Sequence, residues 1–125
     1  MDTDAVRARL LAERERLEGV RQAADRLRAG AKEAAERELS SADQHPAELA
    51  TETIERELDW TVVLHAEAEL AEIDAALARL DTGAYGMCEA CNHPISEGRL
   101  EALPAARYCV EDQAKVARAR RNGHM

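Results

Sequence analysis

Large aromatic side chains are almost missing from this sequence, which has no Phe, one Trp and two Tyr among its 125 residues. Ala, Leu, Glu and Arg dominate instead, and this composition favours long helices with a narrow apolar seam over a thick globular core. The sequence also lacks an apolar run long enough to cross a bilayer, and its first residues lack the basic-then-apolar pattern of a signal peptide. We therefore expect an all-α protein located in the cytoplasm, with no membrane partner.

Cysteine is scarce as well, with three residues in the chain. An odd number cannot pair completely within one chain, and cytoplasmic thiols stay reduced, so a disulfide framework is a poor interpretation. All three cysteines lie in one pattern, which runs Cys88, Cys91, then seventeen other residues, then Cys109 and Asp112. Two close pairs at this separation have the spacing of a tetrahedral zinc site. The sequence therefore predicts a structural zinc ion held by Cys88, Cys91, Cys109 and Asp112.

Asp112 stands where a fourth cysteine is expected. A carboxylate can bind zinc at about 2.0–2.2 Å, although it is a harder ligand than a thiolate. Two alternatives remain open, namely His93 as the fourth ligand or a finger without metal that is held by packing. Three protein ligands and an open position would be typical of a catalytic zinc, but we find no nearby base in the sequence and expect no enzyme.

The net charge of −8 is unevenly distributed. Residues 41–82 carry eleven acidic and two basic side chains, whereas the rest of the chain is nearly balanced. Binding to nucleic-acid phosphates requires Lys and Arg, so we expect no sequence-specific nucleic-acid binding and disfavour a DNA-binding finger. An acidic stretch is better suited to a basic protein surface or to a cleft that carries a metal ion.

Residues 3–40 form the first predicted helix, which contains no Pro. Its apolar and small residues recur at alternating steps of four and three, interrupted at Glu13, and this heptad seam predicts packing against another helix. The seam consists of Val6, Leu10, Leu17, Val20, Ala24, Leu27, Ala31 and Ala34.

A turn at about residues 40–46 separates this helix from a second one, predicted from about Pro46 to Thr82 and ended by Gly83. Its early apolar residues, Ile54, Leu58 and Val62, are out of phase with the later ones, so we expect a stutter near Trp60–Val63. We also expect Trp60 to pack in the seam. The later seam consists of Val63, Ala66, Leu70, Ile73, Leu77 and Leu80. Residues 1–82 are thus predicted to form a long antiparallel coiled-coil hairpin, which we expect to be monomeric.

Residues 83–125 are predicted to form a small zinc-finger module with a short terminal helix. A segment of this length usually needs a staple, which zinc would supply. Asn92 follows the first cysteine pair at a place where the chain is expected to turn through a positive φ. The final helix is predicted from about Tyr108 to Arg120, with Cys109 and Asp112 in its first turn. Its apolar face would consist of Val110, Ala114 and Ala117.

The motif in this segment resembles one known family. It runs Gly86-x-Cys88-x-x-Cys91, then Ile95, then Arg99-Leu100-x-Ala102-x-Pro104 and Cys109, and the turn His45-Pro-Ala-Glu-Leu-Ala-Thr-Glu52 fits as well. Together with a helical hairpin, these residues resemble the DksA/TraR family of bacterial transcription regulators, which have a coiled-coil arm and a C4-type zinc finger.

The resemblance implies that the protein binds bacterial RNA polymerase and modulates initiation. The coiled-coil tip would enter the secondary channel, the pore through which nucleotides reach the catalytic magnesium. The residues that would face the polymerase there are Asp43, His45, Glu48 and Ala50. The family tip carries Asp-x-x-Asp-x-Ala, and His45 takes the place of the first carboxylate.

A second departure concerns guanosine tetraphosphate, which contacts basic residues in DksA proper. The matching positions are Glu72, Leu103 and Gln113, none of which can pair with a phosphate, so we expect regulation without sensing of this nucleotide. The alternative function is a coiled-coil and zinc-finger protein–protein adaptor that does not act through the polymerase channel.

Overall fold

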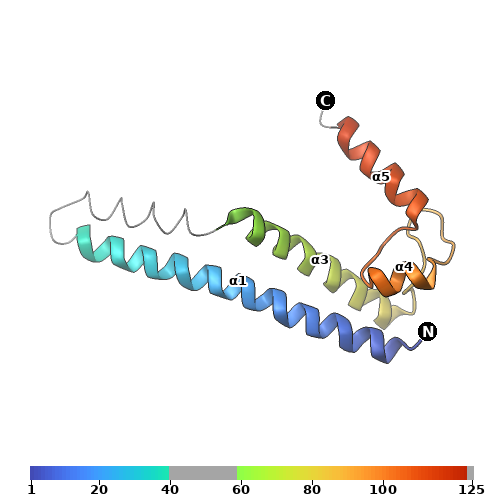
Figure 1. Cartoon of the computed structure of the whole chain (residues 1–125), viewed down its shortest axis with the longest axis horizontal. Coiled ribbons are helices and arrows are strands. Elements are labelled where there is room, and N and C mark those ends of the chain that lie inside the picture. The colour runs from blue at the N-terminus through green and yellow to red at the C-terminus, as the bar shows by residue number, and fades with distance from the viewer. Residues whose placement is uncertain (40–58, 124–125) are drawn as a thin grey trace. The chain divides into compact units, whose positions relative to one another are not determined.

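The computed structural model describes residues 1–39 and 59–123. These ranges contain the helices α1 (Thr3–Leu39), α3 (Trp60–Thr82), α4 (Glu97–Ala102) and α5 (Val110–Gly123), drawn in Figure 1. The predicted all-α fold is confirmed, and α4 is a helix that the sequence pattern did not predict. The predicted turn at 40–46, the seam residues Ile54 and Leu58, and the tip residues lie outside the described residues. The tip residues in question are Asp43, His45, Glu48 and Ala50.

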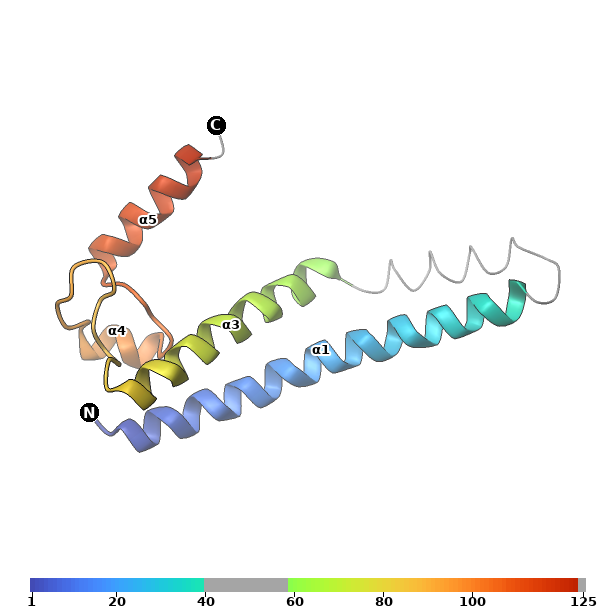
Figure 2. The ribbon, with the colours of Figure 1, turned by 180° about the vertical axis from the view of Figure 1, so that it is seen from behind.

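The chain divides into two compact units. The finger unit combines Met1–Arg14 with Ala71–Met125, and the helix-pair unit is Glu15–Leu70. Each unit contains a segment of α1 and a segment of α3. Within each unit the two segments lie side by side and run antiparallel, as the opposite views in Figure 1 and Figure 2 both show. The division predicted from the sequence, an arm at 1–82 and a finger at 83–125, stays a prediction.

An apolar seam holds the helix-pair unit together. On α1 the buried residues Leu17, Ala24 and Ala31 are spaced seven apart, which is the predicted heptad repeat. On α3 the buried residues are Val63, Ala66 and Leu70, and Val63 forms one core cluster with Ala24. Leu27 was expected in the seam, but 47% of its surface is exposed. Because the helix keeps one narrow face toward its partner, Leu27 falls at the edge of that face.

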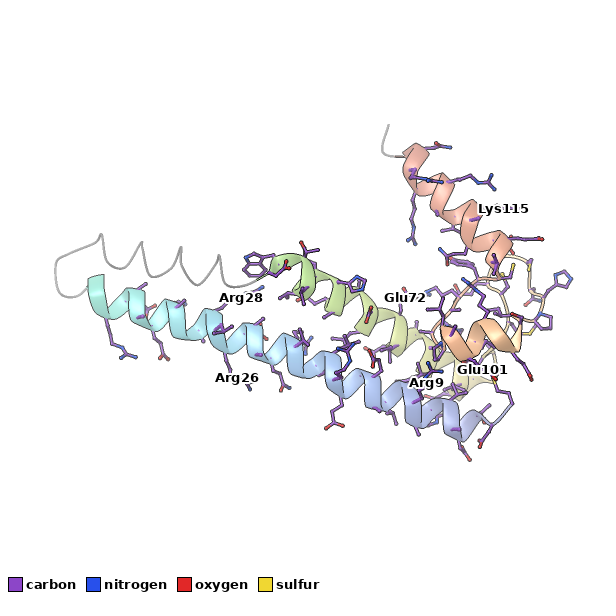
Figure 3. All side chains as sticks on the ribbon, viewed as in Figure 1. Arg9, Arg26, Arg28, Glu72, Glu101 and Lys115 are labelled. Carbon is purple, nitrogen blue, oxygen red and sulfur yellow. The ribbon has the colours of Figure 1, made fainter. Side chains whose placement is uncertain are left out.

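The start of α3 differs from the prediction of an uninterrupted helix from Pro46 to Thr82. Asp59 is not helical, and its carboxylate accepts a hydrogen bond from the Thr61 N–H at 3.0 Å, as an N-cap residue does. Trp60 is 38% exposed instead of packed in the seam, and the Arg28 guanidinium carbon lies 3.8 Å from its ring centroid. Figure 3 shows Arg28 near the start of α3. Val62, 52% exposed, fits the predicted change of phase here.

The seam of α3 shifts where the helix enters the finger unit. Leu77 and Leu80, which were predicted to be buried, are half-buried, whereas Ala76 and Arg79 are buried. The reason is that Arg79 faces the finger loop and donates hydrogen bonds to the carbonyls of Ala105 and Ala106. This face of α3 therefore packs against the finger.

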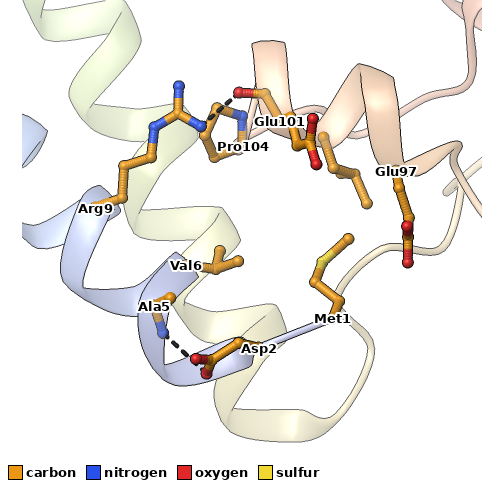
Figure 4. A pocket seen from close by; sticks show the side chains of 9 residues that line it. Met1, Asp2, Ala5, Val6, Arg9, Glu97, Glu101 and Pro104 are labelled. Atoms are coloured by element: carbon orange, nitrogen blue, oxygen red, sulfur yellow. Dashed lines mark hydrogen bonds between the residues drawn. The ribbon is translucent and has the colours of Figure 1, made fainter.

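The start of α1 is fixed to α4. Arg9 donates from its guanidinium to the backbone carbonyl of Glu101, and a shallow hollow of about 290 Å³ lies between the two elements. Figure 4 shows this hollow, with Met1 and Val6 on one side and Pro104 on the other. No helix in the described part of the chain is long and apolar enough to cross a membrane.

Candidate metal centre

The first half of the centre is a tight turn over residues 86–95. The Cys88 N–H donates to the His93 carbonyl at 2.9 Å, and the Ile95 N–H donates to the Gly86 carbonyl at 2.7 Å. Closing the turn requires positive φ values, 87° at Gly86 and 60° at Asn92. The left-handed conformation predicted for Asn92 is therefore confirmed, and it lets the Asn92 N–H return to the Cys88 carbonyl at 2.9 Å.

The second half lies at the start of α5. Cys109 comes directly before the helix, and its carbonyl accepts the Gln113 N–H at 2.9 Å, which places Asp112 one turn further on. The helix begins at Val110, two residues later than predicted, and ends at Gly123. Its predicted apolar face is wrong, because Val110 is 65% exposed and Ala114 and Ala117 are exposed too. The residue that α5 buries is Asp112.

The two halves bring four ligand atoms together. One atom each from Cys88, Cys91, Cys109 and Asp112 lies within 4.8 Å of all the others. The Cys88 and Cys109 sulfurs are both 3.2 Å from the same oxygen, Oδ2 of Asp112. Tetrahedral zinc with Zn–S bonds of about 2.3 Å requires sulfur atoms about 3.8 Å apart, so this cluster has the size of a zinc site. His93 is exposed and is not one of the four.

The two oxygens of Asp112 have different surroundings. Oδ2 faces the thiols, whereas Oδ1 lies 3.8 Å from the Lys115 ammonium group. Figure 3 labels Lys115 on α5. A carboxylate arranged in this way offers one oxygen to an ion. Three thiolates and a carboxylate around a divalent ion carry excess negative charge, which Lys115 partly offsets.

The protonation of the cluster follows from its hydrogen bonds. Thiols of Cys91, Cys88 and Cys109 donate to Asp112 and lower the pKa of its carboxyl to about 2. For Cys91, a hydrogen bond from the His93 N–H lowers the pKa, but the Asp112 carboxylate, burial and the other thiols outweigh it and raise the pKa to about 12. Without metal, the carboxylate is therefore ionised at neutral pH and the Cys91 thiol is protonated.

Three arginines lie around this centre, and the sequence analysis named one of them, Arg99, as part of the family motif. Arg107 donates to the Glu72 carboxylate at 2.6 Å and to Glu89 at 3.5 Å, while the buried Arg79 donates to Glu89 at 3.4 Å. Arg99 donates to the Tyr108 carbonyl at 2.9 Å. Arg79 had a sequence signal too, because it is the single Lys or Arg in the acidic α3.

The positions that were matched to phosphate-binding residues differ in their surroundings. Glu72 is paired with Arg107, Leu103 is 53% exposed, and Gln113 is half-buried on α5. Glu72 thus presents a carboxylate that forms an ion pair within the chain.

Comparison with known proteins places the finger in a family. Residues 83–116 match the family described as "Prokaryotic dksA/traR C4-type zinc finger". The chain is 43% identical over 74 residues to the uncharacterized protein YteA of Bacillus subtilis. This match covers 59% of this chain and 31% of YteA. It is 44% identical over 52 residues to the RNA polymerase-binding transcription factor DksA of Caulobacter vibrioides. This match covers 42% of this chain and 37% of that protein.

A solved structure matches over nearly the whole chain. The transcription factor DksA2 from Pseudomonas aeruginosa has a TM-score of 0.65 and 29% sequence identity, covering 97% of this chain and 89% of the other. The chain spans between about a third and a half of the length of the first curated relatives, 31% of YteA and 49% of the general stress protein 16O of Bacillus subtilis.

Residues 83–116 therefore match the DksA/TraR family of C4-type zinc fingers, and the resemblance seen in the sequence is confirmed. The cofactor of this type of finger is zinc, and the four clustered residues are its possible ligands here. In this chain Asp112 stands where a fourth cysteine is expected.

Proposed function

We propose that this protein binds RNA polymerase and regulates transcription initiation, with its coiled-coil tip in the secondary channel. The observation that carries the proposal is the likeness to DksA2 over 97% of the chain, together with relatives named RNA polymerase-binding transcription factors. The helical hairpin predicted from the sequence would suit a narrow channel, and carboxylates such as Asp43 and Glu48 would respond to a bound magnesium ion. The protein is expected to act as a monomer, in the cytoplasm, without sequence-specific binding to DNA.

Regulation without guanosine tetraphosphate is part of this proposal. It is supported by Glu72, whose carboxylate forms an ion pair of 2.6 Å with Arg107. A phosphate approaching this place would meet a negative charge and would have to compete with it for the guanidinium group. Polymerase binding and transcription should therefore be unchanged by added guanosine tetraphosphate.

A binding and transcription assay with purified bacterial polymerase core tests the first part. The full chain should bind core enzyme and change transcript yield at sensitive promoters. Asp43→Ala and Glu48→Ala should keep binding but lose the change in transcription. The matched control is Glu67→Ala, which removes an exposed carboxylate of α3. If the tip variants still regulate as the wild type does, the channel mechanism is wrong.

We further propose that Cys88, Cys91, Cys109 and Asp112 bind a structural zinc ion, which would cross-link the turn at 86–95 to the start of α5. The support is the 4.8 Å cluster and the shared contact of two sulfurs with Asp112 Oδ2. Zinc supplies the cross-link when bound, and the protein supplies three thiolates and one carboxylate oxygen.

Metal content per chain tests this ligand set. Asp112→Ala should lower zinc affinity by about 10- to 100-fold or more, and Asp112→Cys should raise it, because a thiolate is the softer ligand. His93→Ala is the control and should retain wild-type zinc. Equal zinc in wild type and Asp112→Ala, with loss in His93→Ala, would transfer the fourth position to His93.

The adaptor function is the second candidate, and one departure favours it. His45 replaces the first carboxylate of the family tip, so the feature associated with the channel is incomplete. If the full chain fails to bind polymerase core, the adaptor function is the better conclusion.

A further inference from the structure

The loop that leads into Cys109 is bonded along its whole length. The carbonyl groups of residues 104–108 each accept a hydrogen bond from another part of the finger unit. The donors are the Tyr85 hydroxyl to Pro104 (2.8 Å), Arg79 Nη2 to Ala105 (3.3 Å) and Ala106 (3.4 Å), the Glu89 N–H to Arg107 (2.9 Å), and Arg99 Nε to Tyr108 (2.9 Å).

These donors come from three separate elements. Arg79 is on α3, Tyr85 and Glu89 flank the first ligand Cys88, and Arg99 is on α4. A loop usually exposes such carbonyls to water, so this arrangement fixes the path of the chain relative to all three elements. The next residue is Cys109, and Asp112 follows one turn later.

Arg79 has the strongest constraint among the donors. Its side chain is 11% exposed, and a buried guanidinium requires hydrogen-bond partners. The loop carbonyls and the Glu89 carboxylate provide them. Arg79 and the loop thus satisfy each other, and neither contact involves a thiol or a metal ion.

We propose that Arg79, Tyr85 and Arg99 are positioning residues for the metal centre, which hold the loop so that Cys109 and Asp112 face the first cysteine pair before metal binds. This inference rests on the proposed zinc site. Ordering a ligand segment lowers the apparent affinity for an ion, and a segment that is already ordered escapes this loss. Such preorganisation would offset the weaker match between zinc and the carboxylate of Asp112.

Cobalt titration of the full chain tests the affinity, because cobalt–thiolate absorption reports directly on the centre. Arg99→Met and Arg79→Met should weaken Co²⁺ binding by about 10- to 100-fold, and Tyr85→Phe by several-fold. The controls are Tyr108→Phe, whose hydroxyl has no hydrogen-bond partner among the described residues, and Arg7→Met, which removes an ion pair of 2.9 Å with Asp81. Both controls should bind like the wild type.

Hydrogen exchange on the metal-free chain tests the order of events. The amides of Glu89 and Gln113, bonded to the Arg107 and Cys109 carbonyls, should be protected in metal-free wild type and should exchange faster in the variants. Rapid exchange of both amides in metal-free wild type would overturn the inference, since the metal would then order the loop. Unchanged cobalt affinity in all three variants would overturn it too.

The two proposals can fail separately. If the wild type binds no cobalt, the zinc site itself is wrong, and the exchange experiment still decides whether the loop is held. Should Arg79→Met and Arg99→Met both fail to fold, Tyr85→Phe decides alone, because it removes one hydroxyl from a half-buried ring and leaves the packing in place.

Discussion

The helix-pair unit and the finger unit are stabilised differently. Among residues 15–37 and 59–70 of the helix-pair unit, the buried side chains are all apolar and half of them are alanines: Leu17, Ala24, Ala31, Val63, Ala66 and Leu70. The finger unit buries Arg79 and Asp112 as well as apolar side chains such as Ile95 and Leu100. One unit is held by an apolar stripe, and the other combines an apolar core with hydrogen bonds and ligand atoms.

This difference determines how each unit responds to change. Apolar contacts are non-directional, so a seam tolerates replacement by side chains of similar volume. A buried polar network is directional, and removing one partner leaves the other unsatisfied. The helix-pair unit should therefore respond to side-chain volume, and the finger unit to charge, protonation and metal.

The largest effect is expected from Leu17→Ala in the helix-pair unit. Leu17 is 3% exposed, and truncating a buried leucine costs about 2–5 kcal/mol of unfolding free energy. Leu27→Ala is the matched control, because Leu27 is 47% exposed in the same unit. Urea unfolding followed by the fluorescence of Trp60, the single tryptophan, measures both. Equal losses would mean that the seam does not run through Leu17.

The next effect should be confined to the finger unit and concerns pH. In the metal-free protein, the pKa of Cys91 is about 12, and that of Cys109 is raised because the Asp112 carboxylate and burial outweigh a hydrogen bond from the Asp112 N–H that lowers it. Both thiols thus carry protons at neutral pH, and metal must displace them. As pH rises, proton competition falls, so affinity should increase by at least about 100-fold per pH unit, because the protons of Cys91 and Cys109 are both displaced.

Cobalt titrations between about pH 6 and pH 8 measure this slope. Unfolding followed by Trp60 fluorescence is the control and should change little, since the buried residues described for the helix-pair unit carry no ionisable group. A metal affinity independent of pH would show that the cysteines bind as preformed thiolates.

In both units, the features that the sequence predicted correctly are those that depend on local regularities of the chain. The heptad seam depends on periodicity, so Leu17, Ala24, Val63 and Leu70 were placed correctly from the pattern alone. The ligand cluster depends on spacing within two short motifs, and Cys88 and Asp112 were brought together as expected. These local regularities are visible in one dimension.

What could not be predicted depends on contacts between distant segments. The donors to residues 104–108 come from positions as far away as Arg79, and no periodicity marks them. The prediction of an apolar face on α5 was wrong because helical periodicity does not show whether another element covers that face, and Val110 is 65% exposed. The six-residue helix α4 is too short for a periodic signal, although Ser96, which caps it, was a usable mark.

A smaller effect is expected when the ion pairs of Arg107 are removed. Its side chain is 30% exposed and contacts Glu72 at 2.6 Å and Glu89 at 3.5 Å. Such partly exposed pairs contribute at most about 1 kcal/mol, so Arg107→Met should destabilise the finger unit by that amount or less. Arg118→Met, an exposed arginine of α5, is the control. Hydrogen exchange at low and high NaCl measures the difference, which should shrink with salt because exposed charges are screened.

The smallest effect tests whether charge matters in the helix-pair unit at all. Arg28 lies 3.8 Å from the Trp60 ring centroid, and exposed cation–π contacts contribute about 0.5–1 kcal/mol. Arg28→Met should lower the stability measured by Trp60 fluorescence by that amount, whereas Arg26→Met, an exposed arginine two residues earlier, should not. Methionine keeps most of the aliphatic length, so the change mainly removes the charge. A loss as large as that of Leu17→Ala would mean that this unit, too, depends on a polar contact, and the contrast between the units would fail.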